Sequence, residues 1–248
     1  MSLDVEEFLS QLGKPGKIRR HPATMASLEY VDAPTGRIAY EVAGAGPSVL
    51  IVHGWQGSPR DFSTLMPEFQ AAGARTVALD LPAHGASDGE TLSAHDAAAA
   101  ILALAEKEGP FEAVIAHSFG CVATTLALEK GLKIHAAVFF APPARQEAQL
   151  RRLCTRNGLN DEQAQKVVDA ARARGVDLID IVARAAQRTE PLLVMHASDD
   201  DMTPMSGARD LAAAWPGAKL LPADDLGHNT ILRDKAMIAA ALRFALGA

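Results

Sequence analysis

Short apolar segments alternate with helix-forming segments along most of this 248-residue chain, and this alternation constrains the fold more than any other feature. The apolar segments are expected to form strands at 48–53, 75–80, 111–117, 134–141, 192–197 and 218–221. Most show no polar alternation, as is typical of parallel strands covered by helices on both faces. Segments 28–31 and 37–42 flank the turn Pro34-Thr35-Gly36, which predicts an antiparallel hairpin. The sequence therefore predicts an α/β fold with a mostly parallel, doubly wound sheet of about eight strands.

Helices are expected between these strands. Ser58 and Pro59 supply an N-cap and a first helical residue for a helix that ends near residue 72. Ser93 precedes an alanine-rich helix, which is favoured because alanine has the highest helix propensity. The remaining helices of the expected core lie at 119–130, 207–214 and 229–246.

Residues 142–190 interrupt the alternation with mostly helical, charged sequence. Ligands of open α/β sheets bind beyond the carboxyl ends of the strands. An insertion after the strand at 134–141 would therefore cover the ligand site. We expect a core of 1–141 and 191–248, with 142–190 inserted as a helical cap.

Basic residues gather at the start of the expected cap. Two interpretations remain open: these side chains attract an anionic substrate or an acidic carrier protein, or they coat a solvated helix face, as long charged side chains commonly do. The residues are Arg145, Arg151, Arg152 and Arg156.

Composition excludes several classes of protein. The net charge of −6 argues against nucleic-acid binding, since such proteins usually carry a basic surface. The apolar runs are shorter than the roughly 20 residues that a membrane span needs. Two cysteines in a chain of this length do not indicate an oxidising compartment, and the acidic residues in 1–20 do not fit a signal peptide. We expect a cytoplasmic protein without nucleic-acid or membrane partners; the sequence indicates no oligomeric state.

The segment around Ser118 carries the strongest chemical signal. A strand ends directly before this serine and a helix begins directly after it, so a sharp turn would lift the hydroxyl clear of the sheet. Gly120 and Ala116 are small, as the close approach of strand and helix requires. An ordinary serine helix cap is the alternative interpretation.

A serine nucleophile needs a base, and the base needs a carboxylate. His228 lies in a loop before the last helix, where it could reach Ser118 or could simply be an exposed loop histidine. Asp199, Asp200 and Asp201 follow the strand at 192–197, and spacing to the strand end favours Asp200 as the acid.

An oxyanion formed at Ser118 needs preorganised donors. The backbone N–H of Phe119 is expected to be one donor, at the positive end of the helix that begins there. The N–H of Trp55 is expected to be the second, because Gly54 lets the chain turn toward the site. The indole of Trp55 could equally pack in the core or form a wall of the substrate site.

The order oxyanion loop, serine, aspartate, histidine on alternating strands resembles the α/β-hydrolase fold family over 28–142 and 190–246. The segment Leu79-Asp80-Leu81-Pro82-Ala83-His84-Gly85-Ala86-Ser87 is similar to the family's D-x-P/R-G-x-G-x-S loop. That loop is largely structural in the family, so Asp80 and His84 are not expected to be catalytic. The sequence departs from the family at Ala116, where the G-x-S-x-G pattern has glycine, and at Ala197, where a glycine often follows the histidine at the end of the strand.

The resemblance implies an acyl-enzyme mechanism. Relatives that cleave carbon–halogen bonds or epoxides use an aspartate nucleophile, which Ser118 argues against. Ser118, Asp200 and His228 would act on a small-molecule acyl substrate, a carboxylic ester or thioester, with no metal or organic cofactor. The same triad could instead hydrolyse a carbon–carbon bond or perform cofactor-free perhydrolysis, and the fold could also serve as a non-catalytic ligand receptor.

Four other side chains are expected to be structural. Cys121 should pack as a small apolar group under the helix that follows Ser118. His95, His117 and His135 are likewise expected to have structural roles.

Overall fold

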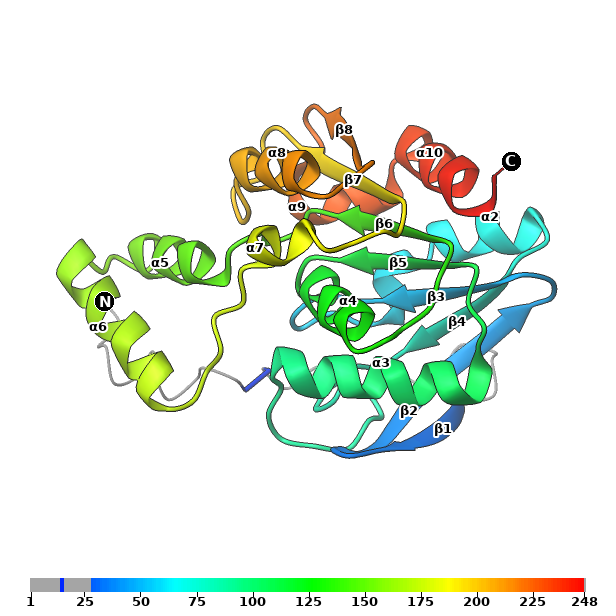
Figure 1. Ribbon diagram of the computed structural model, residues 1–248, viewed down its shortest axis with the longest axis horizontal. Coiled ribbons are helices and arrows are strands. Elements are labelled where there is room, and N and C mark those ends of the chain that lie inside the picture. Colours follow the sequence, from blue (N-terminus) through cyan, green and yellow to red (C-terminus); the bar gives the residue numbers. More distant parts are fainter. Residues whose placement is uncertain (1–13, 16–27, 248) are drawn as a thin grey trace.

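The computed structural model describes residues 14–15 and 28–247, and the expectation about a signal peptide in 1–20 lies largely outside them. An eight-stranded sheet with the order β1-β2-β4-β3-β5-β6-β7-β8 forms its centre (Figure 1). The strands are β1 (Leu28–Ala33), β2 (Gly36–Gly44), β3 (Ser48–Val52), β4 (Arg75–Leu79), β5 (Ala113–His117), β6 (Ala136–Phe140), β7 (Leu192–Ala197) and β8 (Lys219–Ala223).

The pairing of the strands confirms the predicted fold class. β1 and β2 form the antiparallel hairpin, and β2 pairs antiparallel with β4. All pairs from β4 to β8 are parallel. β5, β6 and β7 are buried along their whole lengths, which explains their uninterrupted apolar sequence.

Helices cover both faces of the sheet (Figure 1). One apolar cluster joins the sheet to α3 (Ala94–Glu108), α4 (Phe119–Glu129) and α8 (Met205–Ala214). A second cluster joins the other face to α2 (Leu65–Ala71) and α10 (Lys235–Leu246). Among the helices of the described part of the chain, none has the length and apolarity to cross a membrane.

Two expected helices are shorter than predicted. The segment after Ser58 divides into the 3₁₀ helix η1 (Pro59–Phe62) and α2. The closing segment divides into α9 (Gly227–Thr230), the 3₁₀ helix η2 (Ile231–Arg233) and α10. The side chain of Asp234 accepts hydrogen bonds from the backbone N–H groups of Ala236 and Met237 at 2.9 Å, which makes it the N-cap of a new helix.

The expected cap contains α5 (Gln146–Arg156), α6 (Asp161–Ala173) and α7 (Ile181–Ala185). α5 and α6 pack on each other around a separate apolar cluster that includes Leu150, Cys154 and Val167, and they project from the sheet in Figure 1. Ile181 and Ala185 of α7 instead belong to the main core beside α8. Within the predicted insertion, α5 and α6 thus form the part with its own core.

Candidate active site

Ser118 occupies the sharp turn between β5 and α4. Its φ of 49° and ψ of −121° lie in a region that a residue with a side chain rarely adopts, and such strain is typical of functional positions. Gly120 makes the turn possible, because a methyl group there would lie 2.6 Å from the carbonyl oxygen of Val52. Ala116 is completely buried within β5, so its methyl group is accommodated inside the sheet.

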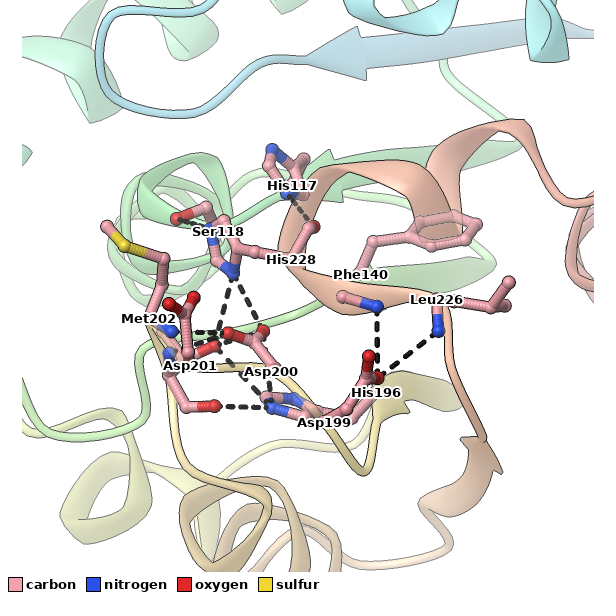
Figure 2. A network of polar contacts seen from close by, with 12 residues as sticks. His117, Ser118, Phe140, His196, Asp199, Asp200, Asp201, Met202, Leu226 and His228 are labelled. Carbon is pink, nitrogen blue, oxygen red and sulfur yellow. Dashed lines mark hydrogen bonds and ion pairs between the residues drawn. The ribbon is translucent and has the colours of Figure 1, made fainter.

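His228 lies in α9 and reaches over the carboxyl ends of the strands. Its Nε2 atom is 3.0 Å from the Oγ atom of Ser118, which is 110 residues earlier in the sequence. The backbone carbonyl of His228 accepts a hydrogen bond from Nε2 of His117 at 3.0 Å. The imidazole is therefore placed to receive the hydroxyl proton of Ser118 (Figure 2).

Asp200 follows β7 and completes a chain of polar contacts. Its Oδ2 atom is 2.7 Å from Nδ1 of His228 and accepts a 2.7 Å hydrogen bond from the Thr203 hydroxyl. Its Oδ1 atom accepts hydrogen bonds from the backbone N–H groups of Met202 and Thr203, each 2.8 Å long. Burial alone would raise the pKa of Asp200, but His228 and the Thr203 donors hold it at about 2. The carboxylate is thus ionised and fixed in orientation.

The two neighbouring acids have other partners. Asp199 accepts hydrogen bonds from the backbone N–H groups of Leu226 and Gly227, which ties the strand-end loop to the segment before His228. The carboxylate of Asp201 pairs with Arg156 at 3.2 Å. Of the three candidate acids, Asp200 is the one in contact with His228, as Figure 2 shows.

The predicted oxyanion donors, Trp55 and Phe119, lie next to each other. Their rings meet edge to face with centroids 5.7 Å apart. Phe119 is the first residue of α4, so its N–H has no acceptor within the helix. Gly54 is pressed against the nucleophile, since a methyl group there would lie 3.0 Å from Cβ of Ser118. The arrangement places the loop after β3 beside the nucleophile.

Two buried histidines hold this loop, a role that the sequence did not reveal. The backbone N–H of Gln56 donates to Nε2 of His84 at 3.1 Å, and the N–H of Leu81 donates to Nε2 of His53 at 3.0 Å. Burial lowers the pKa of His84 and lowers that of His53 to about 3. Both rings are therefore neutral and can accept these bonds. These acceptor roles depend on contacts that form in the tertiary structure. The sequence signal for His84 was its position in the loop that resembles the family's D-x-P/R-G-x-G-x-S segment.

The other side chains that were expected to be structural have varied surroundings. His95 pairs with Asp177 and His135 with Glu112, each at 3.1 Å and each on the surface. His117 is buried beside His228 instead. Cys121 is fully buried with its Sγ atom 3.4 Å from the carbonyl oxygen of Ala116, and burial raises the pKa of its thiol.

His196, at the end of β7, lies behind the candidate acid. Its Nε2 atom donates to the carbonyl oxygen of Thr203 at 2.9 Å and is 3.6 Å from Oδ2 of Asp200. Burial lowers the pKa of His196, so the ring is neutral. Thr203 and His196 together support the acid, and neither was singled out by the sequence.

The basic residues at the start of the expected cap have partners within the chain. Arg145 pairs with Asp180 and Asp210. Arg151 pairs with Glu147, whereas Arg152 and Arg156 donate to the carbonyl oxygen of Asp201. Each of these four arginines therefore has a hydrogen-bond or ion-pair acceptor within the protein. In the part of the chain that the structure describes, no three His, Cys, Asp or Glu side chains are grouped to hold a metal ion.

Comparison with known proteins relates most of the chain to one family. The model described as "Alpha/beta hydrolase family" matches residues 49–241. None of the curated protein sequences compared with this chain matches it.

Three solved structures illustrate the likeness of fold. An esterase from a Rhodococcus species has a TM-score of 0.72 at 18% identity, covering 88% of this chain and 98% of the esterase. A bromoperoxidase from Bacillus anthracis has a TM-score of 0.71 at 16% identity, with 90% and 100% covered. A meta-cleavage product hydrolase from Pseudomonas fluorescens has a TM-score of 0.68 at 16% identity, with 87% and 96% covered. At these identities the likeness concerns the fold alone.

Proposed function

The chain belongs to the alpha/beta hydrolase family, and from this premise we propose that it is a serine hydrolase that cleaves a carboxylic ester or thioester. One observation carries the proposal. Nε2 of His228 lies 3.0 Å from the Ser118 hydroxyl while its Nδ1 lies 2.7 Å from Asp200. This is the geometry in which an imidazole both accepts a serine proton and is stabilised as a cation.

The proposed reaction has two halves. Ser118 attacks the acyl carbon as its proton passes to Nε2 of His228, and Asp200 stabilises the resulting imidazolium. The N–H groups of Trp55 and Phe119 donate to the oxyanion. His228 then gives the proton to the departing alcohol or thiol. Water next attacks the acyl-enzyme with His228 as base, and the carboxylic acid leaves as the Ser118 hydroxyl is restored.

Turnover of short p-nitrophenyl esters and of acyl thioesters tests the proposal. We expect Ser118→Ala to lower kcat by a factor of about 10³ or more, because the nucleophile is lost. Ser198→Ala is the matched control, since this serine contacts Asp224 at 2.7 Å instead of the proposed site. A fluorophosphonate probe should label the unaltered protein at Ser118. Equal turnover by the unaltered protein and Ser118→Ala would remove Ser118 from the mechanism.

Carbon–carbon bond hydrolysis or perhydrolysis is the second candidate. It is favoured by the names of two structural neighbours, the meta-cleavage product hydrolase and the bromoperoxidase. Both reactions could use the same nucleophile and base. Parallel assays with esters, β-diketones and peracid formation distinguish them, because the preferred class should have the highest kcat/KM.

A non-catalytic ligand receptor is the remaining alternative. Ligand binding without labelling of Ser118 by the fluorophosphonate would favour it. We also propose a cytoplasmic location, which is supported by the unpaired thiols of Cys121 and Cys154, since disulfides are usual in oxidising compartments.

A further inference from the structure

Two arginines of the cap helix α5 converge on one backbone carbonyl beside the proposed catalytic acid. Nε of Arg152 donates to the carbonyl oxygen of Asp201 at 2.8 Å, and a terminal nitrogen of Arg156 donates to the same oxygen at 3.0 Å. Arg156 also pairs with the Asp201 carboxylate. The loop that carries the acid is therefore held by the cap.

The same peptide group faces the acid on its other side. The carbonyl of Asp201 and the N–H of Met202 belong to one planar unit, and that N–H donates to Oδ1 of Asp200 at 2.8 Å. Donors at the carbonyl end both fix the plane and polarise the N–H, because hydrogen bonds along a chain strengthen one another. The guanidinium groups thus act on Asp200 through one peptide.

We propose that Arg152 and Arg156 are positioning residues that couple the seating of the cap to the orientation of the Asp200 carboxylate. The proposal rests on the hydrolase function proposed above. The path runs from the two guanidinium groups through the 201–202 peptide to Asp200, and from there to His228 and Ser118. A cap seated on the core would thereby orient the acid for catalysis.

The chain offers matched controls on the same helix and its approach. Arg151 neighbours Arg152 but contacts Glu147 and Gln165. Arg145 anchors the cap through Asp180 and Asp210 and does not touch the 201–202 peptide. Arg151→Gln tests for a general charge effect of the cap, and Arg145→Gln tests for general loosening of the cap.

The first measurement is hydrogen exchange of the Met202 amide by NMR, which needs no substrate. In Arg152→Gln/Arg156→Gln we expect this amide to exchange about tenfold faster, because its bond to Asp200 is no longer held in place. The Arg151→Gln variant should leave it unchanged, and Arg145→Gln, which loosens the cap but keeps both arginines at the Asp201 carbonyl, should raise it by less than about twofold. An unchanged rate in the double variant, or an equal increase in Arg145→Gln, would overturn the proposal.

The second measurement separates kcat from KM with an ester substrate. The double glutamine variant should lose roughly three- to tenfold in kcat with KM within about twofold, since the acid rather than the substrate site is disturbed. Arg152→Lys/Arg156→Lys should recover part of the loss, because lysine also donates to a carbonyl. Faster Met202 exchange with unchanged kcat would refute the catalytic coupling. Absence of any ester turnover would count against the hydrolase function, while Met202 exchange would still test the link to Asp200.

Discussion

His117 donates a hydrogen bond from Nε2 to the backbone carbonyl of His228 at 3.0 Å, and the two rings lie with centroids 4.9 Å apart. His117 directly precedes Ser118, so one buried side chain joins the nucleophile turn to α9, which carries the proposed base. The two segments are far apart in the sequence. The His117 contact therefore helps to keep His228 close to Ser118, in addition to the contact between those two side chains.

His117→Phe should weaken catalysis more than substrate binding. Phenylalanine keeps a ring but offers no donor, which leaves the His228 carbonyl unpaired at a cost of about 1–3 kcal/mol in the free energy of unfolding. We expect kcat to fall about tenfold with KM nearly unchanged. Urea denaturation and steady-state kinetics check both effects. His117→Gln keeps a donor and should lose less; equal losses in both variants would argue against this hydrogen bond.

Asp200→Asn should nearly abolish turnover. The amide cannot stabilise the imidazolium of His228, and replacing the acid of such a triad costs on the order of 10⁴ in kcat. Asp201→Asn removes a carboxylate that pairs with Arg156 but keeps the backbone carbonyl, so kcat should stay within about threefold. Steady-state ester hydrolysis compares the two. A larger loss of kcat in Asp201→Asn than in Asp200→Asn would show that Asp200 is not the acid of the triad.

The sheet and the position of Ser118 could be predicted because their signals are local, whereas Asp200 and His228 were proposed from the order of the parts along the chain. Buried strands such as β5 and β7 are continuous apolar runs, and Ser118 stands where such a run meets a helix. The end of α9 and the start of α10 were missed because the apolar pattern continues across Asp234, whose capping role appears in the structure as hydrogen bonds to backbone N–H groups.

The supports of the site could not be predicted from the sequence. His84 acts on Gln56 and His117 on His228 through contacts between distant segments. A buried histidine has the same local pattern whether its ring fills space or accepts a hydrogen bond. Thr203 similarly acts through a hydrogen bond to Asp200, and the turn that brings the two side chains together is seen in the structure.

Gly120→Ala should be more destabilising than Ala116→Gly. The new methyl group would lie 2.6 Å from the carbonyl oxygen of Val52 and 2.7 Å from that of His53, so α4 and β3 would have to separate. Overpacking of this kind costs about 1–3 kcal/mol. Ala116→Gly should cost about 1 kcal/mol, because glycine weakens a strand interior. Urea denaturation at neutral pH gives both values; equal costs would contradict a requirement for glycine at 120.

Stability should fall as the pH drops below neutrality. Burial lowers the pKa of His53 and of His117 from 6.5 to about 3. Between these values the unfolded chain binds protons that the folded protein excludes, so the free energy of unfolding decreases as pH falls from 6.5 toward 3. The slope from each histidine should rise from about 0.7 kcal/mol per pH unit at pH 6.5 toward about 1.4 kcal/mol per unit at lower pH, as the unfolded histidine becomes fully protonated.

A variant separates the contribution of His117 to the pH dependence of stability from that of the other titrating groups. His117→Gln removes a titrating group while keeping a donor, so its unfolding free energy should depend less steeply on pH than that of the unaltered protein. The difference in slope between pH 6.5 and 5.5 should approach about 1 kcal/mol per unit, since His117 is then neutral when folded and increasingly charged when unfolded. Urea denaturation of both proteins at pH 7.5, 6.5 and 5.5 measures the slopes. Parallel curves across this range would mean that His117 takes up its proton in the folded protein, and that burial does not keep it neutral.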